Sequence, residues 1–248
     1  MSTEIVSVNS LTKIYPGGVK GADGVSFSVR KGEVFGLIGP NGAGKTTILR
    51  IIATILQPSS GSVTIAGYDV VKEPDMVRRI ISYLPEDAGA YKYLTGLEFL
   101  RFIGKLYGYR ESDVEKMVRD GVQISGLGER LNDKIKSYSK GMLRRLLVAK
   151  TLMVNPMLTI LDEPTSGLDV INAIRIRNII RNYAKERGVT VLVSSHNMLE
   201  VEHLCDRVGI IYRGKMLAVG EPKTLKELYA AQNLEEVFIR LIGGKSQQ

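Results

Sequence analysis

The stretch Gly39-Pro40-Asn41-Gly42-Ala43-Gly44-Lys45-Thr46 decides the fold of this chain of 248 residues. It follows the apolar run Glu33–Ile38, which is typical of a buried strand, and it precedes a segment up to about Leu56 that we expect to be a helix. Its spacing, G-x-x-x-x-G-K-[ST], is the Walker A pattern, which binds phosphate groups. A strand, a glycine-rich loop and a helix in this order predict a nucleoside triphosphate site.

Each residue type in this loop has a chemical reason. Gly42 and Gly44 lack side chains, so backbone N–H groups can approach phosphate oxygens closely. The helix N-terminus adds partial positive charge, Lys45 adds a full charge against the β- and γ-phosphates, and the Thr46 hydroxyl suits Mg²⁺. Kinases, GTPases and helicases share the loop, so other motifs must decide the function. The expected nucleotide-binding set here is Gly39, Pro40, Asn41, Gly42, Ala43, Gly44, Lys45, Thr46 and Thr47.

An acidic pattern lies downstream, where the apolar run Met157–Leu161 ends in Asp162 and Glu163. This is a Walker B pattern. If its strand end lies beside the glycine loop, Asp162 can hold Mg²⁺ and Glu163 can polarise the attacking water. Phosphoryl transfer depends mainly on positioning and charge, so Glu163 and Lys45 are the expected catalytic groups. The structural alternative is an acidic turn that caps the next helix.

Strand and helix patterns alternate around these motifs. Alternating residues predict half-buried strands at 4–8 and 25–29, whereas 170–187 predicts a helix and 189–193 a further strand. The stretch from about 90 to 138 has helical periodicity and few strand signals. We therefore expect an α/β fold: a P-loop NTPase core with a mostly parallel sheet, an N-terminal antiparallel β portion and an inserted helical subdomain.

The composition excludes several classes of protein. Hydrophobic residues make up 44% of the chain and charged residues 24%, as in ordinary globular proteins. No apolar run reaches the roughly 18 residues needed to cross a bilayer, so we expect any membrane role to come through a partner. The net charge of +8 permits nucleic acid, anionic lipid or nucleotide as a ligand, but no long run of like charges concentrates it. Cys205 is the single cysteine, which excludes an intrachain disulfide and fits a reducing compartment.

Three further short motifs flank the acidic pattern. Tyr138-Ser139-Lys140-Gly141-Met142 precedes it, whereas Ser166-Gly167-Leu168-Asp169 and Ser194-Ser195-His196 follow it. The order of glycine loop, signature, acidic strand end, D-loop and histidine resembles the ABC ATPase family over nearly the whole chain. Each motif alone is weak evidence for the family, but five motifs in the correct order are specific to it.

The resemblance implies one ABC ATPase domain over residues 1–248. Ser139 and Gly141 match the serine and second glycine of the family signature, which contacts the γ-phosphate bound by a second subunit. Asp169 would then lie at the seam between the two subunits, and His196 resembles the switch histidine that contacts the γ-phosphate and orients the water. The implied parts are a catalytic core at 1–88 and 139–219, a helical subdomain at 89–138 and a C-terminal helical extension at 220–248.

Two more positions follow from the resemblance. Tyr15 resembles the aromatic residue that stacks on adenine, although a packed or exposed loop tyrosine is the alternative. Glu86 stands where the family usually has the Q-loop glutamine, and it would offer an oxygen to Mg²⁺ beside Thr46 and Asp162. The signature departs from the family at Tyr138, Lys140 and Met142, and the acid at Glu86 adds a negative charge beside phosphate.

The resemblance implies an ATP-binding subunit that hydrolyses ATP with Mg²⁺ in a head-to-tail homodimer or paired cassette. Hydrolysis would drive transport through separate transmembrane permease subunits. These would dock near Tyr91, Tyr93 and Leu94, although these side chains could simply pack the subdomain. Residues 83–86 and 234–238 resemble exporter cassettes, so we expect export, at the cytoplasmic, inner face of the cell membrane. The alternative is a soluble ABC ATPase in cluster assembly or on nucleic acid or the ribosome; nucleic acid is the less expected partner.

Overall fold

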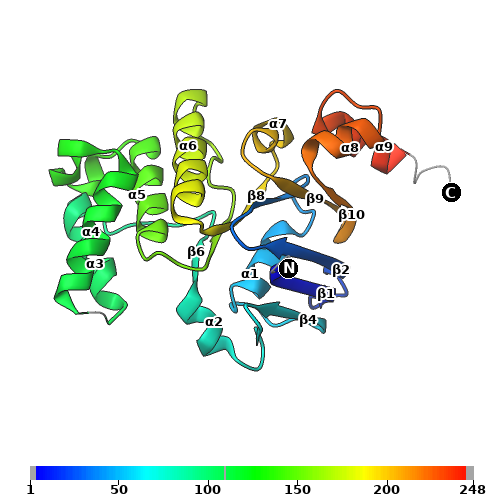
Figure 1. The fold of residues 1–248 in the computed structure, drawn as a ribbon, viewed down its shortest axis with the longest axis horizontal. Coiled ribbons are helices and arrows are strands. Elements are labelled where there is room, and N and C mark those ends of the chain that lie inside the picture. The colour runs from blue at the N-terminus through cyan, green and yellow to red at the C-terminus, as the bar shows by residue number, and fades with distance from the viewer. Residues whose placement is uncertain (1–3, 109, 244–248) are drawn as a thin grey trace.

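The computed structural model describes residues 4–108 and 110–243. A mostly parallel sheet runs through the middle of the molecule and an antiparallel sheet packs against one side of it (Figure 1). The chain thus has the expected α/β fold with both kinds of sheet. Residues 1–3 of the expected core and 244–248 of the expected C-terminal extension lie outside the described residues.

The central sheet has the strand order β10-β9-β3-β8-β7-β6. Neighbours from β9 to β6 are parallel, whereas the edge strand β10 is antiparallel to β9. Phe35 and Leu37 of β3 face one hydrophobic cluster, and Val34 and Ile38 face the other, because side chains alternate along a strand. The strands are β3 (Val34–Ile38), β6 (Ile81–Leu84), β7 (Leu158–Leu161), β8 (Thr190–Ser195), β9 (Arg207–Tyr212) and β10 (Lys215–Gly220).

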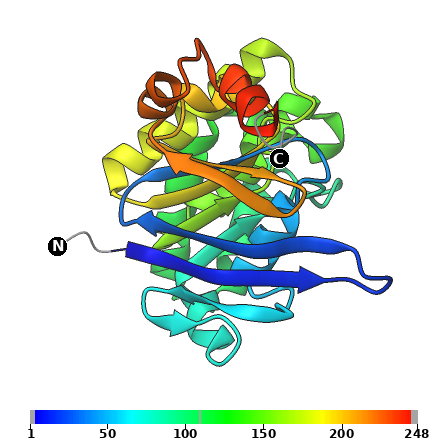
Figure 2. The same cartoon turned by 90° about the vertical axis from the view of Figure 1, so that its right-hand side faces the viewer.

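The antiparallel sheet has the order β2-β1-β4-β5 and lies beneath the β9–β10 hairpin in Figure 2. The expected strands 4–8 and 25–29 lie inside two longer ones. Register shifts interrupt the pairing of β1 with β2, for example between Val8 and Leu11, and they break the two-residue period on which the sequence prediction relied. The strands are β1 (Glu4–Ile14), β2 (Lys20–Arg30), β4 (Ser60–Ile65) and β5 (Tyr68–Asp69).

The helical part lies at one end of the molecule, opposite α8 and α9 in Figure 1. Thr95 and Glu98 begin it with a reciprocal capping box, in which each side chain accepts a hydrogen bond from the backbone N–H of the other. The helical character predicted for the stretch from about 90 to 138 is confirmed. This part contains α3 (Gly96–Leu106), α4 (Glu111–Ser125) and the 3₁₀ turns η1 (Gly128–Asn132) and η2 (Ile135–Ser137), and it leads into α5 (Lys140–Leu152).

Among the remaining helices, the predicted end of one is wrong and two others were not predicted. The helix after the glycine loop ends at Ile52 and does not reach Leu56. Thr54 takes a φ of 62°, which is not helical, and Ile55 is 60% exposed, so the hydrophobic core does not hold this segment in a helix. Neither α2, β6 nor α7 was predicted, because each is short. These helices are α1 (Lys45–Ile52), α2 (Pro74–Ile80), α6 (Val170–Arg187), α7 (Met198–Glu202), α8 (Pro222–Leu228) and α9 (Leu234–Gly243).

Candidate active site

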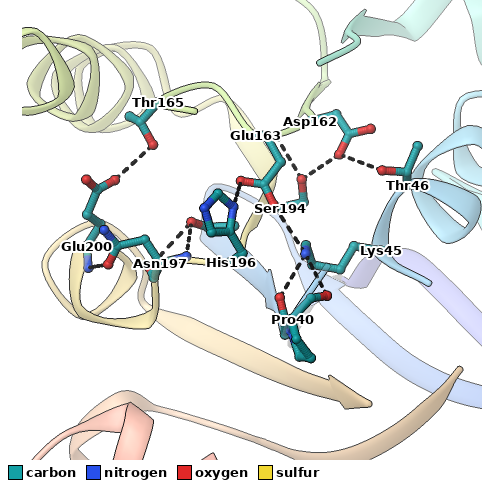
Figure 3. Close-up of polar contacts among 12 residues, drawn as sticks. Pro40, Lys45, Thr46, Asp162, Glu163, Thr165, Ser194, His196, Asn197 and Glu200 are labelled. Atoms are coloured by element: carbon teal, nitrogen blue, oxygen red, sulfur yellow. Dashed lines mark hydrogen bonds and ion pairs between the residues drawn. The ribbon is translucent and has the colours of Figure 1, made fainter. Parts of the chain in front are cut away.

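The principal motifs meet because three neighbouring strands are parallel. The glycine loop follows β3, Asp162 and Glu163 follow β7, and His196 follows β8. β8 lies between β3 and β7, so the carboxyl ends of all three strands reach the same edge of the sheet. Figure 3 shows Lys45, Asp162, Glu163 and His196 converging there.

The glycine loop is shaped by backbone conformation and by close packing. Gly42 and Gly44 have φ angles of 77° and 107°, in the region that side chains disfavour. A Cβ on Gly44 would also collide with the carbonyl oxygen of Gly21. Gly44 is the N-cap of α1, and no side chain caps this helix. Its first N–H groups therefore remain available to an anion.

Lys45 is buried at the base of the loop, with 5% of its surface exposed. Its Nζ donates to the carbonyl oxygens of Gly39 at 2.8 Å and Pro40 at 3.2 Å. It also lies 3.2 Å from Oε1 of Glu163, an oxygen that has no other polar partner within the described chain. The loop thus holds a buried ammonium against the acid of the neighbouring strand.

Glu163 stands between a cation and an imidazole. Its side chain is 5% exposed, and its Oε2 lies 2.8 Å from Nδ1 of His196. Its φ is 48°, an uncommon conformation for a residue with a side chain, so the surrounding contacts must hold it. The hydroxyl of Ser195 accepts the N–H of Asn197, which fixes the turn that carries His196.

Asp162 is fully buried and anchored by three hydroxyl groups. Its Oδ1 accepts from Ser194 at 2.6 Å and Thr46 at 3.3 Å, and its Oδ2 accepts from Tyr83 at 3.4 Å. Burial, together with the charge of Asp162, raises the pKa of Tyr83 to about 12, so this phenol remains a donor. The Ser194 hydroxyl also accepts the N–H of Glu163 at 2.9 Å and thus orients both acids.

Sequence reasoning missed Ser194 and Tyr83 as site residues. Both lie in motifs that it quoted, Ser194 two residues before the histidine and Tyr83 at the end of β6. For Ser194, a hydroxyl side chain at the end of a fully buried strand was the available signal, because a buried polar group needs a partner. Tyr83 is only part-buried, and its strand was not predicted, so it gave no such signal.

A cavity of about 420 Å³ opens beside these groups. Tyr15 lies at one side of it, where its hydroxyl is 3.1 Å from that of Thr47, and its ring packs against Gly21. Glu86 reaches the same cavity from the loop after β6. Its lining is Tyr15, Val19, Lys20, Gly21, Asn41, Gly42, Ala43, Gly44, Lys45, Thr46, Thr47, Glu86 and Glu163.

The oxygen donors beside this cavity fit Mg²⁺. Thr46 and Asp162 offer a hydroxyl and a carboxylate 3.3 Å apart, and Glu86 adds a second carboxylate to the lining. No group of three or more His, Cys, Asp or Glu in the described ranges could hold a metal ion. In nucleotide sites, Mg²⁺ usually binds to one or two protein ligands together with phosphate and water.

Ser139, Gly141 and Asp169 lie outside this cavity. Ser139 caps α5 by accepting the N–H of Met142 at 3.2 Å, and Asp169 caps α6 by accepting the N–H of Asn172 at 2.9 Å. A Cβ on Gly141 would collide with the Asn172 side chain, so the signature packs directly against the first turn of α6, which follows the D-loop. The structure therefore divides the predicted site residues between two surfaces.

Comparisons with known proteins identify the family of this chain. The model of the family described as ABC transporter matches residues 22–166. The chain is 43% identical to the linearmycin resistance ATP-binding protein LnrL of Bacillus subtilis over 197 residues, which are 79% of this chain and 63% of LnrL. It is 37% identical to the ABC transporter ATP-binding protein NatA of the same organism, over 92% of this chain and 93% of NatA.

A solved structure of an ATP binding subunit of an ABC transporter has the same fold, with a TM-score of 0.83 and 29% identity. The alignment covers 96% of this chain and 99% of that structure. The chain spans less than two thirds of LnrL but nearly all of NatA. By sequence match, fold and the arrangement of its motifs, this chain belongs to the ABC transporter family of ATP-binding proteins.

Proposed function

We propose that this chain is the subunit that binds and hydrolyses ATP to drive an ABC transporter. The observation that carries the proposal is the meeting of the glycine loop, Glu163 and Tyr15 around one cavity, with Asp162 and His196 beside it. Triphosphate, metal ion, water and adenine each have a suitable group there.

Binding would use the base of the cavity. The N–H groups of the loop and the Lys45 ammonium would contact the β- and γ-phosphates. Tyr15 would stack on adenine, which contributes affinity with little base selectivity. Thr46, Asp162 and Glu86 would hold Mg²⁺, which when bound neutralises charge on the phosphate oxygens.

Hydrolysis would use the groups that are paired in this structure. Phosphate oxygens would compete with Glu163 for Lys45, which frees the carboxylate to accept a proton from the attacking water. The water oxygen bonds to the γ-phosphorus, and the bond from that phosphorus to ADP breaks. His196 would contact the γ-phosphate and orient the water.

The surface with Ser139, Gly141 and Asp169 would complete the site of a second copy or a paired cassette. None of these residues reaches the cavity of its own chain. Two cassettes arranged head to tail, with two ATP between them, would bring each signature against the other's γ-phosphate. Closure then depends on ATP, because the composite site binds it only when closed.

The membrane would be reached through partner subunits. No helix among the described residues is long and apolar enough to cross a bilayer. Tyr91 and Tyr93 are 60% and 80% exposed on the helical part, and we propose that they receive permease subunits at the inner face of the cell membrane. The resistance function in the name of LnrL supports export. Neither LnrL nor NatA is named for cluster assembly or nucleic acid.

Purified protein tests the proposal through Glu163→Gln, which keeps the shape of the side chain but removes its basicity. We expect wild type to hydrolyse ATP with Mg²⁺, whereas the variant loses hydrolysis and forms an ATP-dependent dimer on size-exclusion chromatography. Glu129→Gln is the control, because this glutamate contacts Asn132 at an exposed site. A Glu163→Gln protein that stays monomeric and hydrolyses ATP at the wild-type rate would refute the catalytic role and the pairing.

A further inference from the structure

Arg144 places a buried guanidinium beside the active site, although no sequence motif draws attention to it. It lies on α5, five positions after Ser139, and is 7% exposed. Its Nε donates to the carbonyl oxygen of Pro164 at 2.8 Å, its Nη2 to that of Glu163, and its Nη1 to that of Glu86 at 3.1 Å. One side chain thus joins three segments through backbone oxygens.

These three segments carry different parts of the proposed site. The helix α5 begins at the signature, Glu163 and Pro164 follow β7, and Glu86 belongs to the loop after β6. Glu163 has a φ of 48°, so its backbone needs external support to present the carboxylate to Lys45 and His196. Arg144 supplies that support at the carbonyl of the same residue.

The charge of Arg144 also suits this place. Burial lowers its pKa, whereas the nearby acids Glu86, Asp162, Glu163 and Asp87 raise it. A guanidinium is not deprotonated in proteins, so Arg144 keeps its positive charge beside these acids. Its planar fork can reach several oxygens at once, which the single ammonium of a lysine at the same position cannot.

We propose that Arg144 is a positioning residue, which fixes the backbone of Glu163 and ties it to the signature helix and to the loop of Glu86. This inference rests on the proposed function. A shift of α5 relative to β7 would pull on the Glu163 carbonyl, so hydrolysis would respond to movement of the helical part. Arg144 itself lines none of the ATP cavity, so its loss should affect the chemical step more than ATP binding.

The neighbouring Arg145 offers a matched control on the same helix. Its Nη1 donates to the carbonyl oxygen of Gly126 at 3.2 Å, at the end of α4, and its Nε has no hydrogen-bond partner among the described residues. Within the described part of the chain, its side chain makes no hydrogen bond to Glu163, Pro164 or Glu86. A substitution there removes an arginine from the same helix and leaves the three carbonyls bound.

The experiment compares Arg144→Met, Arg144→Lys and Arg145→Met in the full chain with Mg²⁺ and ATP. We expect Arg144→Met to lower kcat by roughly 100-fold, because a misplaced catalytic group costs about that much, while KM for ATP stays near the wild-type value. Arg144→Lys should remain at least about tenfold below wild type, since it keeps the charge but not the fork. Arg145→Met should keep the wild-type kcat.

Several results would overturn the proposal. A wild-type kcat in Arg144→Met excludes a role in hydrolysis, and full activity in Arg144→Lys means that charge suffices without the three-way contact. If both Arg144 variants lose ATP binding and the cooperative thermal transition, the residue serves folding. Wild-type protein without ATPase activity would instead refute the proposed function, and a fully active Glu163→Gln variant would refute the catalytic role of Glu163, so these failures are distinguishable from failure of the Arg144 proposal.

Discussion

The ATP cavity and the signature surface use the same kinds of residue in opposite ways. In or beside the cavity, the side chains of Lys45, Asp162 and Glu163 are buried, and each of them is already paired. On the signature surface, Ser139 and Asp169 are exposed, and the contacts of their side chains are helix caps. The difference teaches that the fold of this chain already pairs the side chains at the cavity, whereas the side chains of Ser139 and Asp169 make only local contacts at the starts of their helices and stay open to solvent.

The largest effect should come from breaking the cavity at Lys45. Lys45→Met removes the ammonium that we propose binds phosphate, and it leaves Glu163 buried beside only His196. We expect hydrolysis to fall by more than about 100-fold and ATP affinity to fall with it, because a preorganised charge is lost. Steady-state ATPase assays and nucleotide-binding titrations measure the two quantities.

Lys20→Met is the control for Lys45, because Lys20 also lines the cavity but pairs with the part-buried Asp23 and not with Glu163. It should lose much less activity. Equal losses in the two variants would mean that the general positive charge of the cavity matters, and not the buried pair.

The second-largest effect is expected at Ser194, whose hydroxyl group orients both Asp162 and Glu163. Ser194→Ala deprives Asp162 Oδ1 of its shortest hydrogen bond and leaves the N–H of Glu163 buried and unpaired, at a cost of about 1–3 kcal/mol. We expect kcat to fall by roughly tenfold and the Mg²⁺ concentration for half-maximal activity to rise. Denaturant unfolding and Mg²⁺ titration of the ATPase provide the measurements.

Ser194→Thr restores the hydroxyl and should recover most of the Mg²⁺ response if the added methyl group fits. Thr151→Ala, which removes a buried hydroxyl that donates to Leu147, is the stability control. If Thr151→Ala changed the Mg²⁺ requirement as much as Ser194→Ala, the effect would reflect general loosening of the fold.

A third variant tests the exposed surface that carries Ser139 and Asp169. Ser139→Ala removes the cap of α5, so we expect a stability loss of about 1 kcal/mol in the monomer together with loss of ATP-dependent pairing. Thr95→Ala removes the cap of α3 and should cost a similar amount without affecting pairing. Thermal unfolding and size-exclusion chromatography, both in the Glu163→Gln background, separate the two effects. Pairing that survives in Ser139→Ala would limit this serine to a helix cap.

The smallest expected effect is a change in alkaline stability at Tyr83. Its pKa is raised to about 12, above the ordinary value of 10, so the folded state holds this proton more tightly. The stabilisation is therefore complete below pH 10 and is lost as the pH rises through about 12. Tyr83→Phe should make the free energy of unfolding depend less on pH in this alkaline range.

Tyr183→Phe is the control for Tyr83. The pKa of Tyr183 is also raised to about 12 by burial, but its hydroxyl donates to the carbonyl of Leu152 and not to an acid of the site. Both variants should weaken the dependence of the free energy of unfolding on pH at alkaline pH, whereas only Tyr83→Phe should change the Mg²⁺ requirement of the ATPase. The same Mg²⁺ response in both would argue against a specific role for Tyr83 at Asp162.

Much of the fold and part of the site could be predicted because their signals are local. The glycine spacing, the acids at the end of β7 and the helical periodicity of α3 and α4 depend on neighbouring residues alone. The continuation of β1 beyond Val8 could not be predicted, because it depends on register shifts in its pairing with β2. The early end of α1 could not be predicted either, because it depends on where the hydrophobic core stops covering the chain. Arg144 gave no signal, since its three partners are backbone oxygens of segments distant in the sequence.

By itself, the sequence determined the phosphate loop, its acidic counterpart and the order of motifs that marks the family. Only the tertiary structure decided that Lys45 and His196 both contact Glu163, that Ser194 bridges the two acids, and that the signature lies on a separate surface. The physical reason is that the parallel pairing of β3, β8 and β7 brings three strand ends together, whereas α5 carries Ser139 outside the cavity that they form.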